Sequence, residues 1–171
     1  MKYLAIILAL LLPGPAMSQA GGLPPGIIAV NDKPAPAFTL SDMDGNVSVF
    51  TTASGQWRFV HFWASWCGPC RKEMPAIEKL VASMQGKAIQ FYIINTAEDE
   101  DTIFTFLAAT APELHTLMDR DGQVTEAWQP RGLPATYLVD PQGRLRYQAL
   151  GGREWHQPEY RQFLLRLLTD Q

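Results

Sequence analysis

The segment that most constrains the fold is a short, dense apolar run, RFVHFWA, at residues 58–64. A run of this kind predicts a central strand that is covered on both faces. A second run, AIQFYIIN at residues 88–95, predicts another buried strand. Between them the apolar positions follow helical spacing, at Met74, Ile77, Leu80, Val81 and Met84. The chain should therefore fold as an α/β protein around these two strands.

The rest of the chain continues this alternation of strand-like and helix-like segments without an internal repeat. The turn at residues 42–46 should join two short strands in a hairpin, and so should the turn at residues 140–143. Further strands are expected at residues 38–40, 47–50, 115–119, 136–139 and 144–150, and further helices around residues 103–107, 124–128 and 160–168. This order implies an α/β sandwich with a mixed sheet.

The first twenty residues have the pattern of a secretory signal peptide. Lys2 precedes a ten-residue apolar run, and Ser18-Gln19-Ala20 fits a cleavage site. Ten apolar residues are too few to cross a bilayer easily, which takes about 20. An uncleaved membrane anchor is the alternative interpretation. We expect residues 1–20 to be the signal peptide, residues 21–33 a flexible lead-in, and residues 34–171 one domain.

Composition excludes some classes of partner. The net charge is −3 and no cluster of Lys or Arg stands out, so no nucleic-acid partner is expected. After signal cleavage no stable membrane insertion is expected either. A secreted chain works where disulfides form and persist.

Cys67 and Cys70 are the only cysteines in the chain, and several functions are open to such a pair. A structural metal site normally needs four ligands, and the three histidines are scattered, so no metal is expected. Haem attachment needs histidine after the second cysteine, where this chain has Arg71. A structural disulfide that closes so short a loop stabilises the fold only a little, because it removes little chain entropy from the unfolded state. Redox exchange is the favoured interpretation, and it needs no cofactor.

The position of the pair fits that chemistry. The strand that ends at Ala64 and the helix that opens near Cys67 place the first thiol at a helix N-terminus. Free backbone N–H groups stabilise a thiolate there, so the pKa of Cys67 should fall below the free value of about 8.5. Cys70 lies one turn further along the helix and can resolve a mixed disulfide. Pro69 is tolerated in a first helical turn, and Gly68 and Pro69 should affect the redox poise.

The residues WCGPC match the active-site motif of thioredoxins, and the chain resembles the secreted thioredoxin-like family called TlpA-like. The resemblance extends through residues 34–50, 59–80 and 132–152 and the last helix. It implies a thioredoxin fold with a mixed central sheet, helices on both faces and an extra N-terminal β-hairpin. It also implies that Leu133-Pro134 is the family's cis-proline position, which helps to bind the substrate, and that Trp66 faces the substrate.

Two further residues attract attention through the resemblance. Maturation-type members of the family carry a glutamate at the position of Glu73, where a carboxylate would disfavour a nearby thiolate. The alternative is a solvated acid of the first helical turn. His61 stands where thioredoxins have a buried aspartate. It is either a proton relay to Cys70 that titrates near neutral pH or a hydrogen-bonded core histidine.

The resulting functional prediction is a periplasmic thiol:disulfide oxidoreductase that reduces client proteins, with cytochrome c maturation as one role the family suggests. Glycine-proline between the cysteines is associated with a reducing poise in thioredoxins. Such a reductant needs an electron donor, for which the resemblance suggests a membrane thiol protein. The alternatives are a disulfide-forming oxidant, a peroxidase-like redoxin and a peptide-binding chaperone.

Overall fold

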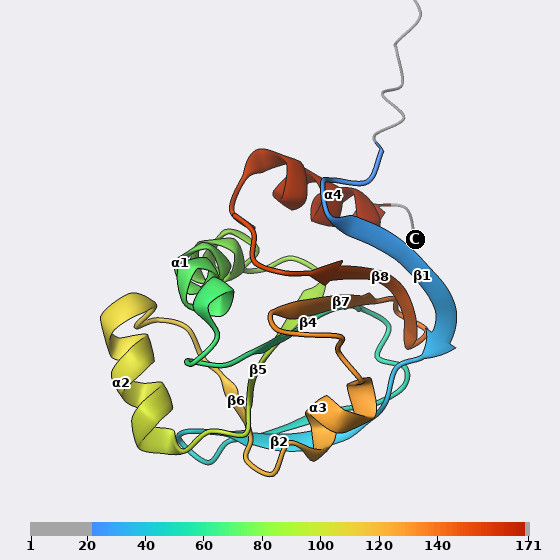
Figure 1. Ribbon diagram of the computed structural model, residues 1–171. Helices are drawn as coiled ribbons and strands as arrows, with labels where there is room; N and C mark the ends of the chain where they lie inside the picture. The colour runs from blue at the N-terminus through green and yellow to red at the C-terminus, as the bar shows by residue number, and fades with distance from the viewer. Residues whose placement is uncertain (1–21, 170–171) are drawn as a thin grey trace, which may run out of the picture.

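The computed structural model describes residues 22–169, so the predicted signal peptide, residues 1–20, lies outside the described part. Within this range the chain forms one eight-stranded sheet and four helices (Figure 1). The elements are β1 (Ile27–Pro34), β2 (Phe38–Asp42), β3 (Val47–Phe50), β4 (Trp57–Trp63), α1 (Gly68–Ser83), β5 (Ile89–Thr96), α2 (Glu100–Thr110), β6 (Leu117–Asp119), α3 (Gln123–Trp128), β7 (Ala135–Val139), β8 (Arg144–Leu150) and α4 (Pro158–Thr169). None of these helices is both long and apolar enough to cross a membrane.

The sheet is mixed and β4 lies inside it. The strand order is β1-β8-β7-β4-β5-β6-β2-β3. Strand β4 runs parallel to β5 and antiparallel to β7, so that His61 lies opposite Ile93 on one side and Thr136 on the other. All seven residues of β4 are buried, which confirms the doubly covered strand predicted from the run at residues 58–64.

Each face of β4 has its own core, because successive side chains of a strand point to opposite faces. Phe59 and Trp63 pack in a cluster with the buried faces of α1, α2 and α4. Val60 and Phe62 pack in a second cluster with Trp128 of α3 and residues of β2 and β3. The sheet is therefore covered on both faces, as the resemblance implied (Figure 1).

The N-terminal part of the domain differs in one respect from the prediction. The hairpin of β2 and β3 forms as expected, with Phe38 opposite Phe50. Residues 22–26 have no regular structure, but residues 27–34, most of the predicted flexible lead-in, form strand β1 against β8. Ile27 is buried in the core, and β1 supplies backbone partners to a strand that would otherwise be an open edge. The domain therefore begins about seven residues earlier than position 34.

Candidate active site

The cysteine pair lies at the start of α1 as a disulfide. Cys67 and Cys70 are joined, with 5.2 Å between their Cα atoms. Cys67 is the N-cap of the helix, and its sulfur accepts a hydrogen bond from the backbone N–H of Cys70 at 3.3 Å. Cys67 keeps 6% of its surface exposed, whereas Cys70 is fully buried. Cys67 is thus the more exposed residue of the pair.

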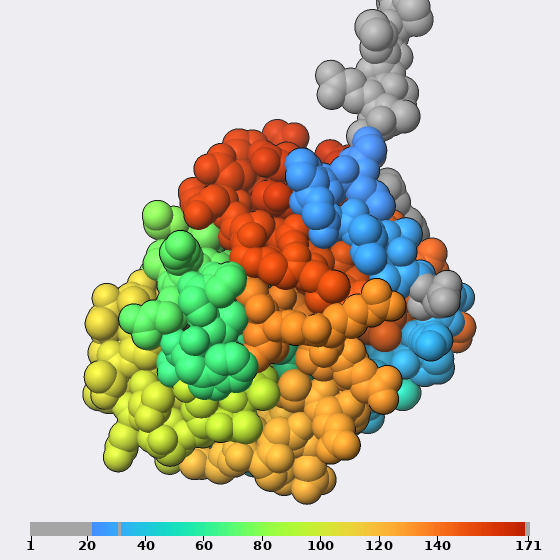
Figure 2. Space-filling view, in the orientation of Figure 1, coloured from blue at the N-terminus to red at the C-terminus, as the bar shows by residue number. Residues whose placement is uncertain are grey.

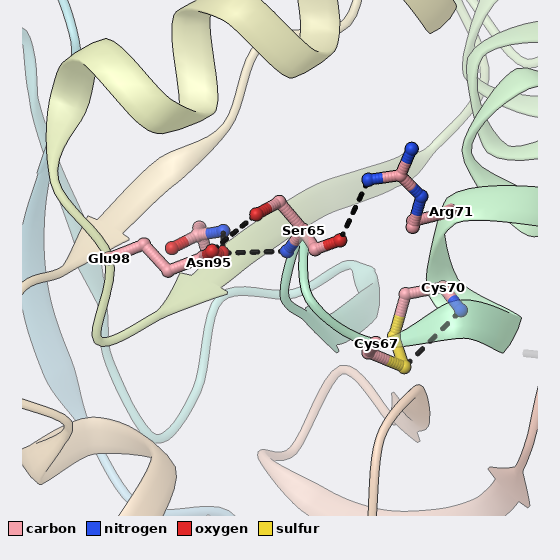
Figure 3. The surroundings of a disulfide bond; sticks show 6 residues. All are labelled: Ser65, Cys67, Cys70, Arg71, Asn95 and Glu98. Atoms are coloured by element: carbon pink, nitrogen blue, oxygen red, sulfur yellow. Dashed lines mark hydrogen bonds between the residues drawn. A yellow bond between two sulfur atoms is a disulfide. The ribbon is translucent and has the colours of Figure 1, made fainter.

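The loop in front of Cys67 is held by side chains from a distant part of the chain. Glu98 accepts hydrogen bonds from the backbone N–H and the hydroxyl of Ser65 and from the side-chain amide of Asn95 (Figure 3). On the other side, a guanidinium N–H of Arg71 donates to the carbonyl oxygen of Ser65 at 3.3 Å. With the backbone fixed at Ser65, the next residue, Trp66, presents a side chain that is 69% exposed.

Glu73 is buried, not a solvated acid as one of the two interpretations had it. Its side chain is 2% exposed, and Oε1 accepts a hydrogen bond from the indole N–H of Trp155. Burial raises the pKa of the Glu73 carboxyl to about 8, against the opposing effects of the indole N–H and of Arg153. The group therefore changes charge in the pH range in which thiols react.

A cleft of about 460 Å³ opens beside the first turn of α1. It is lined by Gly68, Pro69, Lys72 and Glu73 on the helix and by Gly152, Arg153 and Glu154 on the loop that follows β8. The two walls are close together, because a Cβ atom placed on Gly152 would lie 3.0 Å from the carbonyl oxygen of Pro69. In Figure 2 the green start of α1 lies at the surface between the red segment after β8 and the orange segment before β7. The cleft therefore adjoins the disulfide.

His61 lies on β4 within the sheet and is completely buried. Its Nδ1 is 2.9 Å from the hydroxyl of Thr136, and its Nε2 has no hydrogen-bond partner in the part of the chain that the structure describes. Burial lowers the pKa of His61 to about 3, with a smaller contribution from the positive charge of Arg153. Of the two interpretations, complete burial and the contact with Thr136 favour the hydrogen-bonded core histidine over a proton relay that titrates near neutral pH.

The peptide bond between Leu133 and Pro134 is cis, as the resemblance implied. The carbonyl oxygen of Pro134 accepts a hydrogen bond from the backbone N–H of Gly151 at 2.9 Å. This bond ties the segment before β7 to the loop that carries Gly152. Leu133 also packs against the core cluster that contains both cysteines.

The structure thus brings most of the predicted site residues together around the start of α1, and it adds several that sequence reasoning missed. The missed residues are Ser65, Asn95, Glu98, Arg153 and Trp155. Ser65 was detectable from its place immediately before the WCGPC motif. Nothing in the local sequence marks Glu98 or Trp155, because each acts through a contact between distant segments.

Comparison with known proteins relates the chain to thiol-disulfide oxidoreductases. A family model described as the AhpC/TSA family matches residues 31–148. The chain belongs to the AhpC/TSA family. It is 28% identical over 111 residues to the thiol-disulfide oxidoreductase ResA of Bacillus subtilis, covering 65% of this chain and 62% of that protein. It is 31% identical over 112 residues to the ResA of Geobacillus thermodenitrificans, covering 66% and 64%. The chain thus spans less than two thirds of the length of these curated relatives.

Solved structures give the same result for the fold. One from Chlorobium tepidum, which carries the provisional name thiol:disulfide interchange protein DsbE, is 28% identical with a TM-score of 0.67, covering 81% of this chain and 95% of that one. The thioredoxin domain of a thiol-disulfide oxidoreductase from Bacteroides vulgatus is 24% identical with a TM-score of 0.68, covering 81% and 98%. These findings confirm the thioredoxin fold and the resemblance to the secreted thioredoxin-like family.

Proposed function

We propose that the protein is a thiol:disulfide oxidoreductase that reduces disulfides of client proteins outside the cytoplasm through Cys67 and Cys70. The observation that carries the proposal is the placement of Cys67 as the N-cap of α1, with its sulfur accepting the N–H of Cys70. A thiolate at this position is stabilised by the same N–H and by the helix dipole. The names of the relatives support the same chemistry.

The difference in exposure between the two cysteines supports the assignment of their roles. In the reduced protein the thiolate of Cys67 attacks one sulfur of a client disulfide, forms a mixed disulfide and releases the other client sulfur as a thiolate. The Cys70 thiolate then attacks the sulfur of Cys67, which frees the second client thiolate and forms the Cys67–Cys70 bond seen in the structure. Two electrons pass to the client, and two protons convert its thiolates to thiols.

Other residues of the site contact the client or adjust the cysteines. The exposed ring of Trp66 and the segment at Leu133 and Pro134 bind the client chain around its disulfide. Glu73 modulates cysteine reactivity, since a carboxylate one helical turn from Cys70 disfavours a second negative charge there.

The direction and the location complete the proposal. The sequence Gly68-Pro69 between the cysteines supports a reducing poise through the resemblance to thioredoxins. The N-terminal signal pattern supports a periplasmic location, where a membrane thiol protein restores the dithiol. Apocytochrome c is one client that the resemblance suggests.

Trapping of the mixed disulfide tests the mechanism. A Cys70→Ser variant lacks the resolving thiol, so it should accumulate an adduct with a disulfide-containing protein such as insulin, and the adduct should release under dithiothreitol. The Cys67→Ser variant is the matched control and should form little adduct, because Cys70 is buried. Equal adduct formation by both variants would contradict the assigned roles.

The wild-type protein and a variant with both cysteines replaced by serine separate the alternative functions. The wild-type protein with dithiothreitol should accelerate insulin reduction and consume little hydrogen peroxide. A peroxidase would show the opposite preference. A chaperone would still suppress aggregation of an unfolded protein when both cysteines are replaced by serine.

A further inference from the structure

Residues Gly151 to Trp155 belong to the loop that connects β8 to α4, and Gly152, Arg153 and Glu154 of this loop form one wall of the cleft. Gly152 brings this loop against the first turn of α1, because a Cβ atom there would lie 3.0 Å from the Pro69 carbonyl oxygen and 3.5 Å from Glu73 Oε2. A side chain at this position would push the loop away from the helix. The close approach is therefore a built feature of the site.

Trp155 is held firmly at the end of this loop. It is completely buried, and its ring lies edge-on to Phe59 at 4.9 Å and tilted against Tyr160 at 5.3 Å. The guanidinium of Arg153 lies 5.3 Å from the ring centre on the same loop. These contacts fix the direction of the indole N–H, which donates to Glu73 Oε1.

Several charged groups near Glu73 affect its ionisation together with this hydrogen bond. Arg153 favours the ionised carboxyl and Glu154 disfavours it, and both come from the loop, while Lys72 lines the cleft from the helix. The backbone N–H of Arg153 also favours the ionised carboxyl, although the buried Oε2 of Glu73 has no hydrogen-bond partner within residues 22–169. The bond from Trp155 is thus the one side-chain hydrogen bond to this carboxyl among the described residues.

We propose that Trp155 is a positioning residue for Glu73, through which the loop of Gly151 to Trp155 sets the charge on the carboxyl beside the redox pair. This inference deepens the proposed function and rests on it only for the effect on cysteine chemistry.

The titration of Glu73 tests the positioning role directly. In oxidised, carbon-13-labelled wild-type protein the carboxyl carbon of Glu73 should titrate with a midpoint near pH 8. A Trp155→Phe variant keeps an aromatic ring but loses the N–H donor, so the midpoint should move to higher pH. Tyr160→Phe is the matched control. It removes a hydroxyl from the same aromatic cluster, but this hydroxyl donates to the carbonyl oxygen of Pro25 and not to Glu73, so the midpoint should stay unchanged. An unchanged midpoint in Trp155→Phe would overturn the proposal.

A double-mutant comparison tests the coupling to the cysteines. In the reduced protein, the rate of alkylation by iodoacetamide should change with pH as Glu73 ionises. Trp155→Phe should shift this change to higher pH. In the Glu73→Gln background the same substitution should have no effect on the profile. A shift that persists in that background would mean that Trp155 acts only through packing, and the proposal would fail.

A measurement on the wild-type protein covers the case in which Trp155→Phe does not fold. The indole N–H resonance of Trp155 should shift with the same pH midpoint as the carboxyl carbon of Glu73. A resonance that does not change across that range would also overturn the proposal. Because the carbon-13 and indole titrations use oxidised protein without a client, they remain decisive even if the proposed activity is not found.

Discussion

Replacing Glu73 with glutamine should stabilise the folded protein, and the gain should depend on pH. Glutamine fills nearly the same volume and keeps an oxygen that can accept the hydrogen bond from Trp155. What it removes is a carboxylate that is 2% exposed and pays a large desolvation cost when it ionises. The difference in the free energy of unfolding between the two proteins therefore reports the effect of the carboxylate charge.

The size of the effect follows from the pKa. Burial raises the pKa of Glu73 from its usual 4.5 to about 8, which corresponds to about 5 kcal/mol once the group is ionised in both states. Because the folded state holds the proton of the Glu73 carboxyl more tightly than the unfolded state does, the free energy of unfolding of the wild type should fall as the pH rises from 4.5 to 8. Below pH 4.5 the carboxyl is protonated in both the folded and the unfolded state, so its charge has no effect on stability. Between about pH 4.5 and pH 8.5 the advantage of Glu73→Gln should grow by about 4 kcal/mol.

Urea unfolding of the oxidised proteins, followed by tryptophan fluorescence at both pH values, measures this difference. Glu159→Gln, at an exposed position in the first turn of α4, is the control and should give the same difference from wild type at both pH values. If the Glu73→Gln advantage is equally large at pH 4.5 and pH 8.5, Glu73 does not titrate in this range and the burial argument is refuted.

Three further substitutions probe the surroundings of the cysteines. Trp66→Ala should raise KM for protein clients several-fold and leave exchange with oxidised glutathione nearly unchanged, because the ring is exposed beside Cys67; equal loss with both substrates would argue against client contact. Glu98→Ala should lower the free energy of unfolding by about 1–3 kcal/mol in urea titrations, since Ser65 and Asn95 lose an acceptor; no loss would mean that the loop holds without it. His61→Asn should leave the shape of the pH–rate profile between pH 5 and pH 8 unchanged, because His61 is neutral throughout that range. If the variant lacks an inflection that the wild type shows, the result would support the proton-relay role of His61.

Much of the fold could be predicted because its signals are local. The run at residues 58–64 is apolar on both faces, and β4 is buried on both faces. The cysteines could be placed at a helix N-terminus because the apolar run at residues 58–64 ends three positions before Cys67. Strand β1 was missed because Gly21 to Gly26 suggested an irregular segment, and only the pairing with β8 shows that the residues after it form a strand.

The rest of the site depends on contacts between distant parts of the chain. Trp155 lies 82 positions from Glu73, and Glu98 lies 33 positions from Ser65. Helical spacing could place Glu73 on the same face as Cys70, but only the covering loop decides that it is buried. His61 was correctly placed on the central strand, yet its burial among β5, β7 and the aromatic core, not its residue type, sets its pKa.

The reduction potential of the Cys67–Cys70 pair tests the central claim most directly. The protein would be equilibrated with dithiothreitol or glutathione redox buffers, and its thiols would be trapped by alkylation. The account predicts one two-electron transition that involves both cysteines, with a potential closer to the value of about −270 mV found for thioredoxin than to about −120 mV. A potential near −120 mV, the range of strong disulfide-forming oxidants, would contradict the reducing role.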